Sequence, residues 1–268
     1  MHPIFITIGN FTIRSYGVIV AIAVIVAIFV SLHYSNKFKM FDEDTFLNIT
    51  IWAIVGGILG ARICWILTSP YVSFYFDNPQ HILAVWEGGL SFEGSVLGGI
   101  LTVVLLAKRY KVSFWKFLDV GAPGLAIGYA IGKFACFFNG CCYGLAVPDW
   151  WPHVFPLVNI FTDPRSECDV LNAALFPAQL LDSLAGWIAF FVIIFYVMKH
   201  RKYHGQVFIL FCYVFSPLLF AIEFVRYIPT RFLSLTPNQW SAIIMVVSAF
   251  IAERFLRKLL PISDKETL

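Results

Sequence analysis

The stretch YGVIVAIAVIVAIFVSLH, residues 16–33, decides the fold class of this chain. It contains no Asp, Glu, Lys or Arg over nearly the length of about 20 residues that crosses the hydrocarbon core of a bilayer as a helix. Similar apolar runs recur along the chain. Backbone is stable in lipid only as helices or closed barrels, and these runs are too long and too continuous for the alternating strands of a barrel. The sequence therefore predicts transmembrane helices.

The composition of the whole chain supports this prediction. Of its 268 residues, 59% are hydrophobic and only 13% are charged, whereas soluble domains carry about 25% charged residues. The opening MHPIFITIGNFTIRSYG lacks the cationic start and cleavage site of a signal peptide, so the first span is expected to stay in the mature protein. The net charge is only +3, and the Lys and Arg residues lie in short clusters beside apolar runs. This pattern fits control of membrane topology better than a basic groove, so no nucleic-acid partner is predicted.

We predict an all-α integral membrane protein with about seven transmembrane helices, in which residues 1–268 form a single polytopic membrane domain. The predicted spans are Tyr16–His33, Thr45–Thr68, Ser91–Ala107, Phe117–Asn139, Gln179–Met198, Gln206–Arg226 and Asn238–Phe255. Two segments between them are longer than turns. Pro70–Leu90 is rich in aromatic residues and is expected to lie at the membrane interface, and Tyr143–Phe176 is expected to form an outer arm or cap.

The distribution of basic residues predicts the orientation, because Lys and Arg accumulate in cytoplasmic loops. Most of the 19 basic residues fall on one side of the predicted spans: Lys37, Lys39, Lys108, Arg109, Lys111, Lys116, Lys199, Arg201, Lys202, Arg254, Arg257, Lys258 and Lys265. This pattern favours an odd number of spans, with the N-terminus outside the cytoplasm and the C-terminus inside.

Ionisable residues within the predicted spans mark the candidate site, because each costs about 2.5–3.5 kcal/mol at the centre of a transmembrane helix. They are Arg62, Glu93, Lys133, Asp182 and Glu223. Together with Arg14 and Arg226 they fall in the outer half of their spans, which predicts a layer of charge suited to a charged substrate. Structural ion pairs are the alternative. Glycine-rich breaks in WEGGLSFEG and KFACFFNGCCYG predict a cavity that opens outward, since irregular backbone at membrane depth lines cavities.

Several chemistries have no motif in this sequence. It contains no phosphate-binding loop, no His-Glu-x-x-His helix and no Gly-x-Ser-x-Gly elbow. Cys136, Cys141 and Cys142 could form a metal site or supply a nucleophile, but Cys is also a common small buried residue and no His lies near them. We therefore predict no metal and no cofactor. Cys168 could be oxidised with Cys141 or Cys142, and the sequence leaves this open.

Seven motifs occur along the chain in a fixed order. They are IRSYG at residues 13–17, GARI at 60–63, WEGGLSFEG at 86–94, DVGAPGLAIGYAIGKFACFFNGCCYG at 119–144, PAQLLD at 177–182, IEFVR at 222–226 and LTPNQW at 235–240. In these motifs and their order, the chain resembles the prolipoprotein diacylglyceryl transferase family over nearly its whole length.

The resemblance implies an enzyme of the bacterial cytoplasmic (inner) membrane that catalyses the first step of lipoprotein maturation. A diacylglyceryl group would pass from phosphatidylglycerol to the thiol of the lipobox cysteine of a prolipoprotein, with formation of a thioether and release of glycerol phosphate. The expected partners are phosphatidylglycerol, the signal peptides of prolipoproteins and other membrane lipids.

The same resemblance suggests roles for the site residues. We predict Glu93, Lys133 and Glu223 as catalytic, with a carboxylate that orients or deprotonates the thiol and a cation that stabilises the departing phosphate. Arg62 and Arg226 are expected to bind the phosphate together with Lys133. The remaining predicted substrate-binding residues lie in the matching motifs: Tyr16, Asn139, Gly144, Gln179 and Asp182.

The chain also departs from the family pattern at positions that are functional in the family. Glu93 stands where the family often has His, Lys133 and Cys136 stand where its signature has Arg and Asn, and Leu219 stands where many members have Arg. Lys keeps the charge of Arg but loses its bidentate grip on phosphate. Two alternatives therefore stay open: a paralogue with another lipid donor or acceptor, and a non-catalytic lipid-binding or transport protein.

Overall fold

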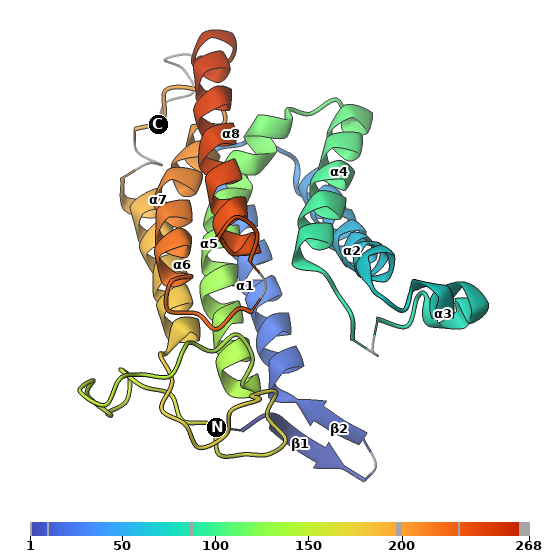
Figure 1. Ribbon diagram of the computed structural model, residues 1–268. Coiled ribbons are helices and arrows are strands. Elements are labelled where there is room, and N and C mark those ends of the chain that lie inside the picture. The colour runs from blue at the N-terminus through green and yellow to red at the C-terminus, as the bar shows by residue number, and fades with distance from the viewer. Residues whose placement is uncertain (1, 10, 86–87, 197–199, 230, 263–268) are drawn as a thin grey trace. The chain divides into compact units, whose positions relative to one another are not determined.

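The computed structural model describes residues 2–9, 11–85, 88–196, 200–229 and 231–262 (Figure 1). The chain forms two compact units. Unit 1 comprises residues 1–31 and 118–268, and unit 2 comprises residues 32–117. That residues 1–268 act as one membrane domain remains a prediction.

A helix occupies each of the seven predicted spans. The helices are α1 (Ser15–Lys37), α2 (Glu43–Thr68), α4 (Phe92–Tyr110), α5 (Phe114–Asn139), α6 (Ala178–Phe195), α7 (Gln206–Ile222) and α8 (Pro237–Leu259). Their bounds differ from the predicted spans by a few residues. The predicted end of the fifth span, Met198, and the basic residues Lys199 and Lys265 lie outside the described residues.

Four of these helices are long and apolar enough to cross a membrane, counted within the described residues: α1, α2, α5 and α6. Helix α7 is apolar but shorter, with 17 residues. The structure is thus α-helical and compatible with a membrane protein, and the count of seven spans and the orientation stay predictions.

In unit 2, glycines bring α2 and α4 into close contact. A Cβ atom added to Gly60 would lie 2.4 Å from the carbonyl oxygen of Gly94 and 2.8 Å from Cα of Gly98. A Cβ added to Gly98 would lie 2.3 Å from the carbonyl oxygen of Gly56. Small residues allow helix backbones to approach closely in this way. Glycine at these positions is therefore what allows α2 and α4 to pack with their backbones in contact.

The segment between α2 and α4 contains two short helices, α3 (Val72–Asp77) and η1 (Pro79–His81). The aromatic side chains of Tyr71 and Phe76 are 71% and 73% exposed, as expected of a segment that lies in a membrane interface. After η1 the chain passes through Gly88 and Gly89, whose φ angles of +84° and +72° favour glycine. The irregular backbone predicted in this segment is present.

Unit 1 is a bundle of helices preceded by a hairpin that the sequence analysis did not predict. Strands β1 (Ile4–Ile8) and β2 (Phe11–Arg14) pair antiparallel, directly before α1. Helix α5 packs on α1, where a Cβ on Gly124 would meet the carbonyl oxygen of Ala27 at 2.4 Å. Helices α6, α7 and α8 complete the bundle (Figure 1).

The long segment between α5 and α6, residues 140–177, folds as an arm without helices among its described residues. A small apolar core of Tyr143, Phe161, Cys168 and Leu175 holds it together. Within unit 1, the arm and the hairpin lie at one end of the bundle, and α8 ends at the other (Figure 1). The arm therefore lies at the C-terminal end of α5, where the motif at residues 119–144 continues beyond the helix into residues 140–144, the signature loop.

Candidate functional site

Four charged residues of unit 1 meet in one buried cluster. The ammonium of Lys133 on α5 lies 2.8 Å from Oδ2 of Asp182 on α6, and the guanidinium of Arg226 contacts the same oxygen. Nε of Arg226 lies 2.8 Å from Oε1 of Glu223, at the end of α7. The side chains of Asp182 and Glu223 are completely buried, and that of Arg226 is 4% exposed. The cluster holds two cations and two carboxylates and is formally neutral.

Glu223 also joins the end of α7 to the start of α8. Its Oε2 accepts a hydrogen bond of 2.8 Å from the hydroxyl of Thr236, and its Oε1 accepts one of 3.1 Å from the amide of Asn238. Thr236 caps α8 and exchanges hydrogen bonds with Gln239 in a capping box. Because both carboxylate oxygens already have partners, Glu223 is placed to orient Arg226.

Lys133 is the accessible member of the cluster, with 15% of its side chain exposed. Its ammonium lies 5.0 Å from the centre of the Tyr129 ring, one helical turn earlier on α5. The Tyr129 ring in turn packs edge-on against Phe215 of α7 at 4.7 Å. Sequence reasoning missed Tyr129. The signal was the spacing of four residues from Lys133, which places both side chains on one face of a helix.

The cluster also contains an unused acceptor. Oδ1 of Asp182 is buried and has no hydrogen-bond partner among the described residues, and the same is true of Oδ1 of Asn139. Buried polar atoms are normally paired with protein or water, so such atoms suit a bound water or substrate group. Asn139 is the last residue of α5 and is 4% exposed.

Hydrogen bonds to its backbone groups fix the loop after α5. The carbonyl of Cys141 accepts a hydrogen bond of 2.8 Å from the side-chain amide of Gln179, which is fully buried at the start of α6. Gly144 donates from its backbone to the carbonyl of Phe176 and pairs with Arg226 in an isolated β-bridge. A Cβ at Gly144 would lie 2.6 Å from that carbonyl oxygen. Gln179 and Gly144 thus shape the loop next to the charge cluster.

Tyr16, in the first turn of α1, is 41% exposed. Its phenol lies close enough to Cys136, Cys141, Cys142 and Glu167 to interact with them electrostatically. The structure therefore brings Tyr16 to the same end of unit 1 as the signature loop. Arg14, just before it, is exposed and lies 4.0 Å from Glu167.

The guanidinium of Arg62, in unit 2, is hydrogen-bonded to backbone carbonyl groups. It donates to the carbonyl oxygens of His81, Ile82, Gly88 and Gly89, and the residue is 2% exposed. The predicted role of Arg62 in phosphate binding stays a prediction. The contacts themselves give it a structural function, because one side chain fixes the path of the glycine-rich loop.

Glu93 lies in the first turn of α4, where it is exposed. Its Oε2 accepts a hydrogen bond of 2.8 Å from the hydroxyl of Ser91, which caps the helix. A carboxylate in the first turn also interacts favourably with the helix dipole. The catalytic role of Glu93 stays a prediction.

Outside the helices, burial changes the chemistry of two groups in the arm. Burial raises the pKa of Tyr143 to about 12 and raises the pKa of the Cys168 thiol. Sγ of Cys168 donates to the carbonyl of Val170. All six cysteines of the chain lie in its described part and all are free thiols, so the structure contains no disulfide between Cys168 and Cys141 or Cys142.

Within the cluster, Arg226 is held by two carboxylates, while the side chain of Lys133 is paired with Asp182 and partly exposed.

Comparison with known sequences identifies the family of the chain. A sequence model of the prolipoprotein diacylglyceryl transferase family matches residues 3–253. The phosphatidylglycerol–prolipoprotein diacylglyceryl transferase of Listeria monocytogenes serovar 1/2a is 30% identical over 226 residues, which cover 84% of this chain and 79% of the relative. The protein of that name from Thermus thermophilus is 29% identical over 230 residues, which cover 81% of each chain.

A further relative shows higher identity over a shorter stretch. The protein of the same name from Trichormus variabilis is 35% identical over 155 residues, so that this chain spans about half of its length, 54%. The match to the family model covers the charge cluster, the signature loop and six of the seven long helices completely. The chain belongs to the prolipoprotein diacylglyceryl transferase family.

Proposed function

We propose that this protein transfers the diacylglyceryl group of phosphatidylglycerol to the cysteine thiol of a prolipoprotein. The cysteine sulfur forms a bond to the glyceryl carbon that carried the phosphate, and the carbon–oxygen bond to the phosphate breaks. Glycerol phosphate leaves with the electron pair and takes up the proton that the thiol loses. The names of the relatives from Listeria monocytogenes and Thermus thermophilus support this reaction.

The observation that carries the proposal is the cluster of Lys133, Asp182, Arg226 and Glu223 at the end of unit 1 where the arm lies. A phosphodiester anion is the group that such a partly open pair of cations recognises. Lys133 contacts the phosphate and stabilises the leaving group, and Arg226 fixes the charge distribution behind it. Asp182 and Glu223 hold both cations in place.

The acceptor is a thiol, which must lose its proton before it attacks. We assign this step to Glu93 as the first candidate, because its carboxylate is exposed and accepts only the hydrogen bond from Ser91 among those described. Glu223 is the second candidate, although three groups already occupy its oxygens. Tyr16, Asn139, Gly144 and Gln179 shape the site at the signature loop.

We further propose seven spans in the bacterial inner membrane, with the N-terminus outside the cytoplasm. Four helices meet the length and apolarity of a span, and α4, α7 and α8 are the remaining three. In unit 1 the hairpin and the end of α8 lie at opposite ends of the bundle, which agrees with termini on opposite sides. The basic residues identified above set the direction.

The test compares lipid donors with purified protein in detergent. The protein is incubated with a lipobox peptide and with phosphatidylglycerol, phosphatidylethanolamine or phosphatidylcholine, and the thioether peptide is measured by mass spectrometry. We expect product with phosphatidylglycerol. We expect the rate to fall by about 10²–10³ in Lys133→Ala, the usual effect of removing one group that stabilises the leaving charge.

The matched control is Lys258→Ala, which removes the same charge from an exposed position in the last turn of α8. This variant is expected to keep the activity of the unaltered protein. Product with another donor only would favour the paralogue, and equal rates in both lysine variants would remove Lys133 from the site.

A further inference from the structure

Three thiols that the proposed reaction does not use converge at the end of α5. We propose that Cys136, Cys141 and Cys142 form a binding site for a thiophilic metal ion, Zn²⁺, with three thiolate ligands and an open fourth position. This proposal does not depend on the proposed transferase activity. It replaces the expectation of no metal, which rested on the frequency of Cys as a small buried residue and on the absence of a nearby histidine in the sequence.

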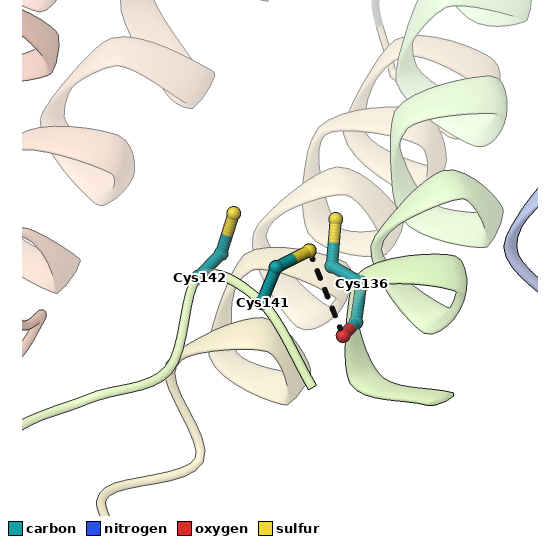
Figure 2. Close-up of side chains that lie close together, drawn as sticks. All are labelled: Cys136, Cys141 and Cys142. Carbon is teal, nitrogen blue, oxygen red and sulfur yellow. Dashed lines mark hydrogen bonds between the residues drawn. The ribbon is translucent and has the colours of Figure 1, made fainter. Parts of the chain in front are cut away.

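The three sulfur atoms lie within 4.8 Å of one another. Figure 2 shows Cys136 on the last turn of α5 and the other two on the loop that follows. The side chains of Cys136 and Cys142 point the same way, and the thiol of Cys141 between them donates to the carbonyl of Cys136 at 3.9 Å, a contact that an ion would replace. A tetrahedral zinc ion at 2.3 Å from each sulfur needs sulfur atoms about 3.8 Å apart. The thiols thus need to move by only about 1 Å or less to bind a common ion.

The backbone presents the thiols in a fixed arrangement. Gly140, with φ of +86°, ends the helix and turns the chain back, and its N–H donates to the carbonyl of Cys136. Gln179 holds the carbonyl of Cys141, and Cys142 itself has φ of +59°, a left-handed conformation that is uncommon for a residue with a side chain. A site held by its surroundings in this way loses little entropy when an ion binds.

The donor set selects the ion. Thiolate ligands favour Zn²⁺ and Cu⁺ over Mg²⁺ and Ca²⁺, which prefer oxygen. Within the described residues, no His, Asp, Glu or further Cys joins the three sulfurs, so water or a ligand would fill the fourth position, as in catalytic zinc sites. A three-thiolate zinc complex carries one negative charge, and Lys133 and Arg226 both interact electrostatically with Cys142. These cations favour such a complex.

The test measures metal binding directly. The full-length protein, purified in detergent with a non-thiol reductant, is loaded with Zn²⁺ or with Co²⁺ as a spectroscopic probe, and excess metal is removed. We expect one metal ion per chain by elemental analysis and a thiolate-to-cobalt charge-transfer band. Binding replaces three S–H protons, which pass to the buffer.

Single substitutions Cys136→Ser, Cys141→Ser and Cys142→Ser are each expected to weaken binding by at least about tenfold, because even indirect partners of metal ligands have effects of that size. Cys64→Ser and Cys168→Ser are the matched controls, since both are free thiols outside the cluster, and they are expected to bind as the unaltered protein does.

A second readout needs no variant. Zn²⁺ should protect Cys136, Cys141 and Cys142, and not Cys64, from alkylation by N-ethylmaleimide, as mapped by mass spectrometry. Absence of metal from the reduced, loaded protein would overturn the proposal. Equal binding in the triple serine variant, or alkylation of the three thiols at the same rate with and without Zn²⁺, would overturn it as well.

Discussion

Substitution of Asp182 by Asn tests the charge cluster most sharply. The carboxylate of Asp182 is completely buried, and its Oδ2 contacts both Lys133 and Arg226. Asn has nearly the same shape. Its oxygen can still accept from both cations, and its amide would take the place of Oδ1, which has no donor to accept from among the described residues. The change therefore removes one negative charge with little change in packing.

The expected cost follows from the surroundings. Two unit charges 4 Å apart interact by about 4 kcal/mol at an effective dielectric constant of about 20, and the loss of one partner from a buried ion pair costs about 3–5 kcal/mol. Because Asn keeps the acceptor, we expect the lower end, about 3 kcal/mol. One kcal/mol corresponds to about 2–4 °C in Tm for chains of about this size, so Tm should fall by about 6–12 °C.

The assay is thermal unfolding in detergent at a fixed heating rate, with Asp163→Asn as the matched control. Asp163 pairs with Arg165 in the arm, where the arginine side chain is 62% exposed, and such surface pairs contribute little. The control is therefore expected to unfold at the temperature of the unaltered protein. If both variants showed the same Tm, the argument that Asp182 neutralises two buried cations would be refuted.

Three further predictions follow from single contacts. Lys133→Arg should keep at least about a tenth of the transfer rate, since it retains the cation, whereas loss equal to that of Lys133→Ala in the same assay would contradict a role through charge. Glu93→Gln should leave Tm unchanged, because the residue is exposed. The same variant should slow transfer by about 10² or more, because Gln cannot accept the thiol proton. An unchanged rate would shift that role to another group. Gly60→Ala should destabilise the protein by about 2 kcal/mol or more in thermal unfolding, because the added Cβ would meet the backbone of α4. Gly121→Ala is the control: a Cβ added there has no neighbouring atom within 4 Å outside its own helix turn, so this variant should be neutral or slightly stabilised. Equal effects of the two substitutions would contradict the close contact of α2 and α4.

Much of the fold could be predicted from the sequence because the apolar runs match the length that lipid imposes. Each predicted span coincides with a helix, and the main differences are at the ends, where α8 continues to Leu259 and α7 stops at Ile222. The hairpin at residues 4–14 was missed. Its signal was the β-branched and aromatic run IFITI followed by the turn pair Gly-Asn, but this run is short beside the apolar run that follows.

The charged residues of the candidate site could be identified from the sequence, but their partners only in part. An unpaired charge within a membrane span is costly, so the sequence indicates that Lys133 and Asp182 each need a partner, and in the structure they pair with each other. The same reasoning could not foresee Arg62, whose partners are four backbone carbonyls, because a loop path is not encoded in a side-chain pattern. The convergence of the three thiols likewise depends on the turn at Gly140.

The most direct test of the proposed function follows both products of one turnover. Phosphatidylglycerol labelled in its glycerol headgroup is incubated with the purified protein and a lipobox peptide, and the thioether peptide and labelled glycerol phosphate are quantified over time. The account predicts that both appear in equal amounts and that a peptide with Ser in place of the lipobox cysteine yields neither. Absence of both products, while the Listeria monocytogenes relative forms them under the same conditions, would contradict it.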